Sequence, residues 1–166
     1  MIEIERKYII KMPDMDLLRE CEGFTESEIL QIYLNSPASV THRIRRRVFA
    51  DGIVYTETKK QRIDKMSAVE DERDISENEV NHLCGNIKIG TVPIKKKRYS
   101  FLYDGKIFEL DVYPEWKRMC ILEIELASRE ESVKLPHFIV VLDEVTGDSA
   151  YSNAGMARLF PQERSV

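Results

Sequence analysis

Alternating charged pairs, each of one sign, recur along this chain and constrain its fold more than any other feature. In the first, Glu3-Ile4-Glu5-Arg6-Lys7, charged residues recur with the period of two that sends successive strand side chains to opposite faces. On one strand this would be ordinary solvent-facing polarity. The same alternation returns, however, in Arg43-Ile44-Arg45, Glu70-Asp71-Glu72, Lys96-Lys97-Arg98, Glu109-Leu110-Asp111 and Glu123-Ile124-Glu125.

The separation of sign between these pairs points to a ligand. Like charges side by side on a strand repel, so a sheet that serves only stability mixes its signs. Here acidic and basic pairs are kept apart, as expected if one wall binds cations and another binds anions around a metal polyphosphate. If the charged residues point inward, their apolar partners should face outward under the helices: Ile4, Ile44, Leu110, Val112, Ile124 and Leu126.

Strand patterns dominate the rest of the chain. Asp51-Gly52 and Asp104-Gly105 are typical of hairpin turns. Ser76 and Glu79 have the spacing of a capping box, which predicts the start of a helix. We expect strands near 2–11, 29–34, 40–49, 53–60, 67–75, 92–103, 106–113 and 119–127, and helices near 13–23, 76–85, 128–136 and 151–160. The last helix should present Met156, Leu159 and Phe160.

About eight strands joined mostly by short turns favour closure, because a closed barrel has no exposed edges. We therefore predict a mainly β (α+β) protein, an eight-stranded antiparallel β-barrel that forms a charged tunnel, with a few flanking helices. At 166 residues and 43% hydrophobic content, the chain is long enough for one domain over residues 1–166.

Composition excludes several classes of protein. The formal net charge of -4 argues against a nucleic-acid or anionic-membrane surface, and no apolar run approaches the roughly 18 residues of a membrane span. Three cysteines without a C-x-x-C pair, and no secretory leader, favour the cytoplasm. The three histidines lack metal-like spacing, and no Gly-rich phosphate loop, G-x-S-x-G or H-E-x-x-H pattern occurs. The chemistry is therefore expected from strand side chains.

The ordered motifs resemble the CYTH superfamily, the triphosphate tunnel metalloenzymes. The resemblance covers nearly the whole chain: E-x-E-x-K at 3–7, R-x-R at Arg43 and Arg45, T-x-K at Thr58 and Lys60, E-x-E at Glu70 and Glu72, K-x-R-Y at 96–99, E-x-D at Glu109 and Asp111, and E-x-E at Glu123 and Glu125. Residues 144–148 and 151–153 are similar to the segment before the C-terminal helix that plugs one end of the family's tunnel.

Two features depart from the family pattern or leave it ambiguous. Ser149 and Ala150 stand where members usually carry basic residues, which puts substrate preference in doubt. Lys59 and Lys60 adjoin, so only one can face the tunnel; the T-x-K spacing selects Lys60, with Lys59 as the alternative.

The resemblance implies a metal-dependent hydrolase that cleaves a phosphoanhydride bond of inorganic tripolyphosphate or a related triphosphate, as small bacterial single-domain tripolyphosphatases do. Carboxylates suit Mg²⁺ or Mn²⁺, and guanidinium and ammonium groups suit phosphate. The expected metal ligands are Glu3, Glu5, Asp111, Glu123 and Glu125, with Glu70, Glu72 and Glu109 as supporting acids. The expected phosphate-binding residues are Lys7, Arg43, Arg45, Lys60, Lys96 and Arg98.

Lys7 and Tyr33 are the expected catalytic residues, because family members place a similar lysine and tyrosine together. Burial lowers the pKa of a lysine and nearby carboxylates raise it, so the sequence leaves the direction for Lys7 open. Tyr33 could equally be a packed wall aromatic.

Two other functions stay open. One is another activity of the superfamily: thiamine triphosphatase, nucleoside triphosphatase or class IV adenylyl cyclase. No group of residues in the sequence indicates the adenine-binding pocket that a cyclase needs. The other is a non-catalytic polyphosphate-binding module, which would have little use for so many acids. The expected partner is a small-molecule triphosphate; a homodimer is compatible with the sequence, and Mg²⁺ versus Mn²⁺ is left open.

Overall fold

The computed structural model describes residues 1–165 and confirms the predicted barrel. The strands are β1 (Ile2–Lys11), β2 (Thr25–Leu34), β3 (Thr41–Phe49), β4 (Gly52–Arg62), β5 (Ser67–Asp74), β6 (Ile94–Tyr103), β7 (Lys106–Val112), β8 (Met119–Glu125) and β9 (Val141–Glu144). The helices are α1 (Met15–Arg19), α2 (Glu77–Leu83) and α3 (Asn153–Arg158), with short 3₁₀ turns at Cys84–Asn86 and Ser149–Tyr151.

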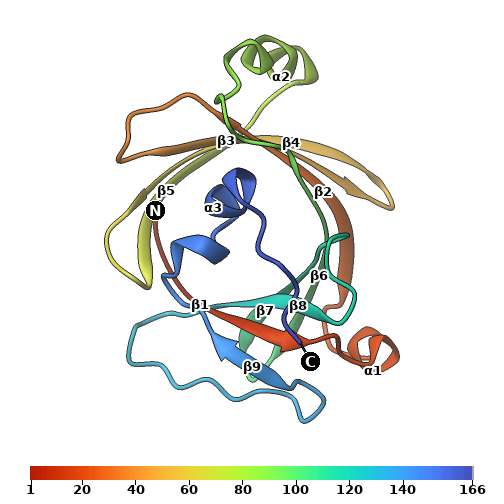
Figure 1. Cartoon of the computed structure of the whole chain (residues 1–166). Helices are drawn as coiled ribbons and strands as arrows, with labels where there is room; N and C mark the ends of the chain where they lie inside the picture. The colour runs from red at the N-terminus through yellow and green to blue at the C-terminus, as the bar shows by residue number, and fades with distance from the viewer. Residues whose placement is uncertain (166) are drawn as a thin grey trace.

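Eight antiparallel strands close into a ring, and β9 is added beside them. The strand order is β5-β4-β3-β2-β6-β7-β8-β1-β9, and the additional pairing of β5 with β1 closes the barrel (Figure 1). The closing register sets Glu3 opposite Ala68. β9 pairs with β1 farther along the strand, at Tyr8 to Ile10.

Local chemistry accounts for the turns and for α2. Asp104 and Gly105 both have positive φ, at 50° and 70°, as the tight hairpin between β6 and β7 requires. The capping box before α2 forms in both directions: Ser76 accepts from the Glu79 amide, and the Glu79 carboxylate accepts from the Ser76 amide. These two predictions are confirmed.

The predicted helix at 128–136 is wrong. The Glu131 carboxylate accepts a hydrogen bond from the Ala127 amide, which closes a turn that does not continue as a helix. Val133, Leu135 and Phe138 instead pack against the outside of the barrel from a segment without helix or strand. Apolar burial along this segment therefore outweighs the capping-box pattern of Ser128 and Glu131. The strand β9 that follows was not among the expected strands.

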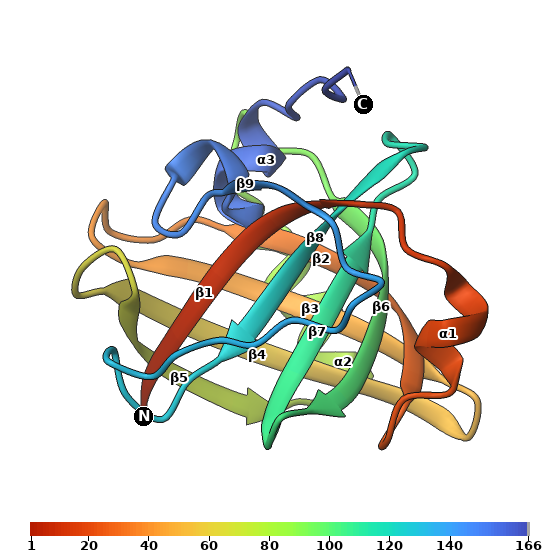
Figure 2. The same cartoon turned by 90° about the horizontal axis from the view of Figure 1, so that it is seen from below.

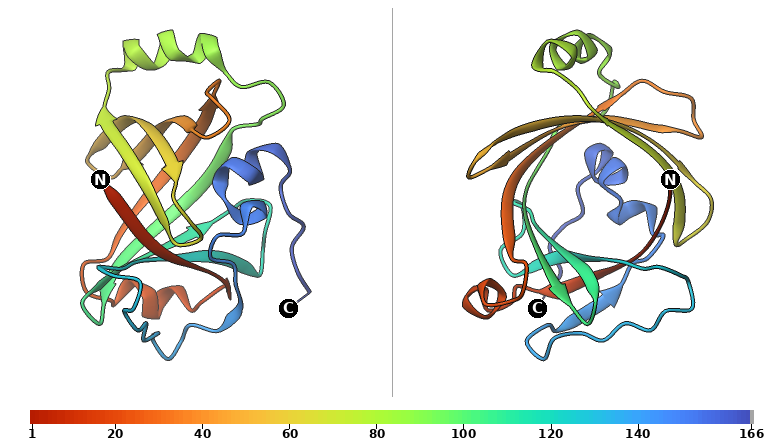
Figure 3. Two further views of the ribbon diagram at one scale, coloured as in Figure 1. Left: turned by 90° about the vertical axis from the view of Figure 1, so that its left-hand side faces the viewer. Right: turned by 180° about the vertical axis from the view of Figure 1, so that it is seen from behind.

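The main core lies outside the barrel, as the alternation predicted. Leu110, Ile124 and Leu126 are buried there, with Ile4 and Val112 packed against them, and Leu18 of α1 covers part of this face. Ile44 faces outward in a smaller cluster beneath α2. Figures 2 and 3 show α1 and the 127–140 segment on the outside of the ring, on the side of β1, β7 and β8.

The barrel interior is polar in one part and apolar in another. α3 docks at one end on a second core that includes Ile9, Ile94, Ile121 and Met119, with Met156 of the helix fully buried (Figure 2). Of the three residues that the last helix was expected to present, Met156 and Phe160 pack in this core, whereas Leu159 is 80% exposed, because α3 ends at Arg158 and the chain becomes extended at Leu159. Within residues 1–165, no helix is long and apolar enough to span a membrane.

Candidate functional site

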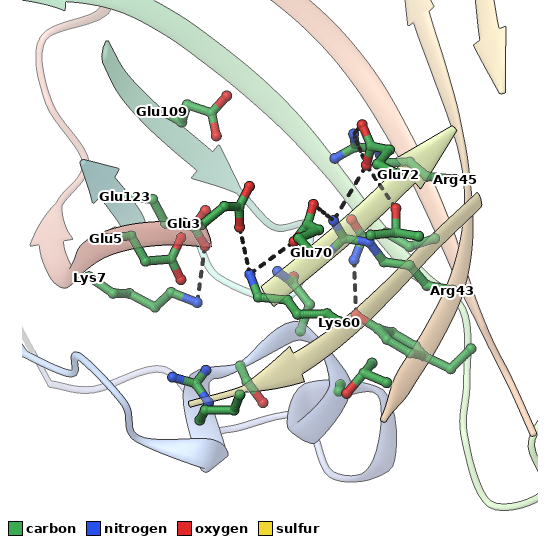
Figure 4. A pocket seen from close by; sticks show the side chains of 18 of the residues that line it. Glu3, Glu5, Lys7, Arg43, Arg45, Lys60, Glu70, Glu72, Glu109 and Glu123 are labelled. Atoms are coloured by element: carbon green, nitrogen blue, oxygen red, sulfur yellow. Dashed lines mark hydrogen bonds and ion pairs between the residues drawn. The ribbon is translucent and has the colours of Figure 1, made fainter. Parts of the chain in front are cut away.

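A cavity of about 450 Å³ occupies the polar part of the barrel, and all eight barrel strands contribute to its lining. Glu5, Lys7 and Glu123 project from β1 and β8, opposite Arg43 and Arg45 from β3 (Figure 4). The alternation of strand side chains thus delivers the charged residues of each strand to one enclosed space. The cavity separates the two signs only in part, because several cations are paired with acids.

The acidic side of the cavity is built by register between neighbouring strands. Glu5 of β1 lies opposite Glu125 of β8, and Glu123 is opposite both Lys7 of β1 and Glu109 of β7. Burial raises the pKa of Glu125, and the carboxylates of Glu109 and Glu5 raise it further. Among residues 1–165, neither Glu5 nor Glu125 forms an ion pair with a cation, so these two carboxylates are free to bind one.

Barrel closure creates an ion-pair group that joins β1, β4 and β5. Lys60 Nζ lies 3.0 Å from a Glu3 oxygen and 3.2 Å from a Glu70 oxygen (Figure 4). Burial and the neighbouring Glu70 raise the pKa of Glu3 to about 6 despite Lys60. Arg43 and Lys60 overcome the effect of burial on Glu70 and lower its pKa. Lys60 lines the cavity and Lys59 is exposed outside it, which confirms the choice of Lys60.

Arg98 is the centre of a second, deeper group. Its Nε and Nη2 donate to the two oxygens of Asp111 at 2.7 and 2.8 Å, and it also contacts Glu109 and Glu123. Lys96 donates to Asp111 at 2.7 Å. Burial lowers the pKa of Lys96 to about 8, although Asp111 opposes this. Asp111 is fully buried and does not line the cavity, so the structure places it behind the two cations and not among the exposed candidate metal ligands.

The basic side is a row of arginines on β3. Arg45 donates to Glu72 at 3.3 Å, and Arg43 lies 3.6 Å from Glu70. Arg47 donates through Nε to the Ser27 hydroxyl at 2.8 Å. Burial and the neighbouring Arg43 lower the pKa of Arg45 to about 10. The Nε groups of Arg43 and Arg45 are buried without a hydrogen-bond partner in the described chain, so both donors are unsatisfied in the free protein.

Lys7 and Tyr33 both reach the cavity, as predicted. Lys7 Nζ lies 3.0 Å from Glu123. Burial lowers the pKa of Lys7, but Glu123 and Glu5 outweigh it, so the net shift is upward and the ammonium form is favoured. The Tyr33 hydroxyl accepts a hydrogen bond from Gln31 at 3.2 Å, and burial raises its pKa. The sequence had left open whether the pKa of Lys7 is raised or lowered, and the structure shows that it is raised.

The remaining candidates also line the cavity, and the structure adds cations that the sequence analysis missed. Arg47 is two residues after Arg45, and Arg62 is two residues after Lys60, so the alternation in the sequence already indicated that both face the cavity. Arg158 comes from α3, where strand alternation gives no signal. Ser149 and Ala150, the departure from the family pattern, lie outside the cavity lining.

The donor set suits a hard divalent cation in its chemistry. Glu5 and Glu125 face each other without a cation partner, and Glu109 and Glu123 are their neighbours. Carboxylate oxygens are the ligands that Mg²⁺ and Mn²⁺ prefer. In residues 1–165, however, the resting side chains form no ready-made group of three metal-binding residues. A metal would therefore require the carboxylates to turn toward it.

A closed antiparallel barrel around a cavity of opposed acids and arginines is the architecture of the tunnel class of triphosphate-binding folds. Solved structures of similar fold support this assignment. The inorganic triphosphatase NE1496 is 28% identical with a TM-score of 0.60, over 96% of each chain. A second structure of NE1496, described as a hypothetical protein, is 29% identical with a TM-score of 0.59, over 96% of this chain and 99% of that one.

HpAC1 from Hippeastrum, named as a candidate adenylyl cyclase with a dominant triphosphatase activity, shares the fold. It is 15% identical with a TM-score of 0.51, over 76% of this chain and 81% of that chain. The sequence matches no protein-family model, and no curated protein matches it. The likenesses among solved structures confirm the resemblance to the CYTH superfamily and, within it, to an inorganic triphosphatase.

Proposed function

We propose that this protein is a metal-dependent hydrolase that cleaves a phosphoanhydride bond of inorganic tripolyphosphate or a related triphosphate. The observation that carries the proposal is the enclosed cavity in which Glu5 of β1 and Glu125 of β8, which form no ion pair within residues 1–165, face arginines on β3 with unsatisfied Nε donors. The likeness to the inorganic triphosphatase NE1496 supports it. Phosphoryl transfer needs mainly positioning and charge neutralisation, so a lined cavity without a covalent nucleophile is sufficient.

Each wall has a separate task in this proposal. Glu5 and Glu125, with Glu3, Glu109 and Glu123 beside them, would hold Mg²⁺ or Mn²⁺. The bound ion would neutralise phosphate charge during the reaction. Arg43, Arg45 and Lys60 would bind the phosphate oxygens, and Lys60 would then release Glu3, one of its present partners, to the metal. Lys7, held as an ammonium, is suited to stabilise developing negative charge and not to act as a general base.

Phosphate release from a panel of tripolyphosphate, thiamine triphosphate and nucleoside triphosphates, together with a cyclic AMP assay, tests the proposal. We expect metal-dependent release of phosphate from tripolyphosphate. Cyclic AMP from ATP would favour the cyclase alternative instead. Tight binding of tripolyphosphate without turnover would favour the non-catalytic module.

Tripolyphosphate with Mg²⁺ is expected to raise the melting temperature, because it binds only the folded protein. Arg45→Ala should reduce this shift by more than half, since it removes a cavity guanidinium. Arg46→Ala is the matched control, because Arg46 is the adjacent residue on β3 and is exposed on the outer face. Thermal scans with and without ligand measure both. An equal shift in the wild type and Arg45→Ala would argue against the phosphate assignment.

Lys7→Ala is expected to reduce kcat by about 100-fold or more and to raise KM less, because charge stabilisation acts mainly in the transition state. Tyr33→Phe removes only a hydroxyl and should reduce kcat less than tenfold, about the value of one neutral hydrogen bond. Steady-state kinetics at saturating Mg²⁺ separate the two constants. An increase in KM alone for Lys7→Ala would make Lys7 a phosphate-binding group and would leave Glu72 as the next candidate to orient water.

A further inference from the structure

A smaller cavity of about 80 Å³ adjoins the main cavity at its α3 end. The two cavities share part of their lining, including Tyr33, Thr41 and Arg158. The rest of the small cavity is formed by the end of β2 and the residues after it, by the 88–91 segment before β6, and by His42 of β3, which lies 2.7 Å from its partner Glu57. No acidic residue in the described chain lines it, in contrast to the main cavity.

Two cations of this small cavity are unpaired. Neither Arg158, which is exposed, nor Lys88, which is half-buried, forms an ion pair with a residue of the 1–165 range. Lys60 and Arg45 in the main cavity, by comparison, are already paired with carboxylates. An anion that enters the small cavity therefore meets free positive charge and has no carboxylate in its lining to displace.

Backbone contacts hold the walls of the small cavity together. The Lys88 amide donates to the Tyr33 carbonyl at 2.9 Å, which ties the 88–91 segment to β2. The Val92 amide donates to the Ala157 carbonyl at 2.8 Å, which ties the same segment to α3 beside Arg158. The two cations are thus carried by elements that are fixed to one another and to the wall of the barrel.

We propose that Arg158 and Lys88 form a subsite for a fourth phosphate, so that the protein binds linear inorganic polyphosphates longer than tripolyphosphate. This inference rests on the proposed function. The hydroxyl of Thr41 in the same lining can donate to the phosphate oxygens, whereas the Thr91 hydroxyl already donates to the Lys88 carbonyl at 2.7 Å. The volume of about 80 Å³ is far below the roughly 300–1,000 Å³ of cavities that hold organic ligands. The subsite therefore selects a phosphate group and not a nucleoside.

The test compares tripolyphosphate with tetrapolyphosphate as ligands and as substrates. Titration calorimetry in metal-free buffer measures binding, and phosphate release with Mg²⁺ measures KM and kcat. The proteins are the wild type, Arg158→Ala, Lys88→Ala and the outer-face control Arg46→Ala. We expect the wild type to bind tetrapolyphosphate more tightly than tripolyphosphate. Lys88→Ala and Arg158→Ala should each weaken tetrapolyphosphate binding about fivefold, as fits a charge contact at a partly open site. Lys88 lies outside the lining of the main cavity, so Lys88→Ala should change tripolyphosphate binding less than twofold.

Equal effects of Lys88→Ala on both ligands, or equal affinity of the wild type for both, would overturn the subsite. Hydrolysis of tripolyphosphate with no preference for tetrapolyphosphate would remove the subsite and leave the proposed function intact. Absence of hydrolysis, together with a preference for tetrapolyphosphate in calorimetry that depends on Lys88, would support the subsite and reject the enzyme. Arg158 has no side-chain hydrogen bond within the described chain, so the substitution should leave the melting temperature unchanged.

Discussion

Glu5→Gln and Glu125→Gln are each expected to reduce tripolyphosphate hydrolysis by at least 1,000-fold while the fold stays intact. The two side chains face each other across β1 and β8 and have no cation partner in residues 1–165. A neutral amide keeps the shape but removes the charge that a divalent cation needs. Loss of one carboxylate should therefore remove the metal and, with it, several kcal/mol of transition-state stabilisation.

Glu125→Gln should also preserve or raise the melting temperature at pH 7. Burial and the nearby Glu109 and Glu5 carboxylates raise the pKa of Glu125 above its ordinary value of 4.5. A carboxyl with a higher pKa in the folded state favours folding below the unfolded-state pKa and loses that contribution as pH rises through the folded-state pKa. Glutamine has no such titration. Any gain in melting temperature should therefore be present at pH 7 and disappear toward pH 4.

Glu26→Gln provides the control for these measurements. Glu26 is an exposed acid on β2 whose only ion pair in the described chain is a 3.8 Å contact with Lys97, so both activity and stability should be unchanged. Phosphate release over a series of Mg²⁺ and Mn²⁺ concentrations, with EDTA as the metal-free condition, measures the effect. Full activity of either cavity variant, or undiminished wild-type activity in EDTA, would contradict the metal assignment.

Arg98→Ala is expected to destabilise the free protein by about 3–5 kcal/mol, because it leaves buried carboxylates without a partner. Arg98 is 6% exposed and donates to both oxygens of Asp111, and it contacts Glu109 and Glu123. Its principal role in the free protein is thus to compensate the acids behind and beside the cavity. Phosphate binding by Arg98, which the sequence analysis proposed, would require it to exchange one of these partners.

Urea unfolding at several pH values separates this explanation from a simple loss of packing. Arg98 and Lys96 overcome the effect of burial on Asp111 and lower its pKa. Without Arg98 the pKa of Asp111 should rise, so protonation would relieve the penalty as pH falls, and the deficit relative to the wild type should shrink from pH 7 toward pH 5. Arg98→Lys, which keeps the charge but not the forked geometry, should be intermediate. A deficit that does not change with pH would point to packing instead.

The inward and outward faces of the strands follow from the sequence by itself. The period of two depends only on local backbone geometry, so Glu3, Glu5 and Lys7 share the lumen while Ile4 faces the outer core. The hairpin at Asp104-Gly105 and the capping box at Ser76 are equally local, because the interacting groups lie within three residues of each other. Local rules were therefore sufficient for the barrel strands and for α2.

Only the tertiary structure decided which charges meet. Closure of β1 on β5 brings Glu3 to Lys60, 57 residues away, and raises the pKa of Glu3 to about 6. Burial places Asp111 behind Lys96 and Arg98, whereas the family resemblance had implied that Asp111 is a metal ligand. The pKa of Lys7 is raised by Glu123 of β8 as well as by Glu5 of its own strand.

Contacts between residues far apart in the chain also explain why the helix expected at 128–136 does not form and why Arg158 was not predicted to line the cavity. Residues 128–136 have a capping pattern, but the outer core offers their apolar side chains more burial in a non-helical segment than a short helix would. Arg158 reaches the cavity because α3 docks on an apolar layer inside the barrel, a contact between residues far apart in the chain. Alternation and capping are set by neighbours along the chain, whereas pairing, burial and pKa are set by neighbours in space.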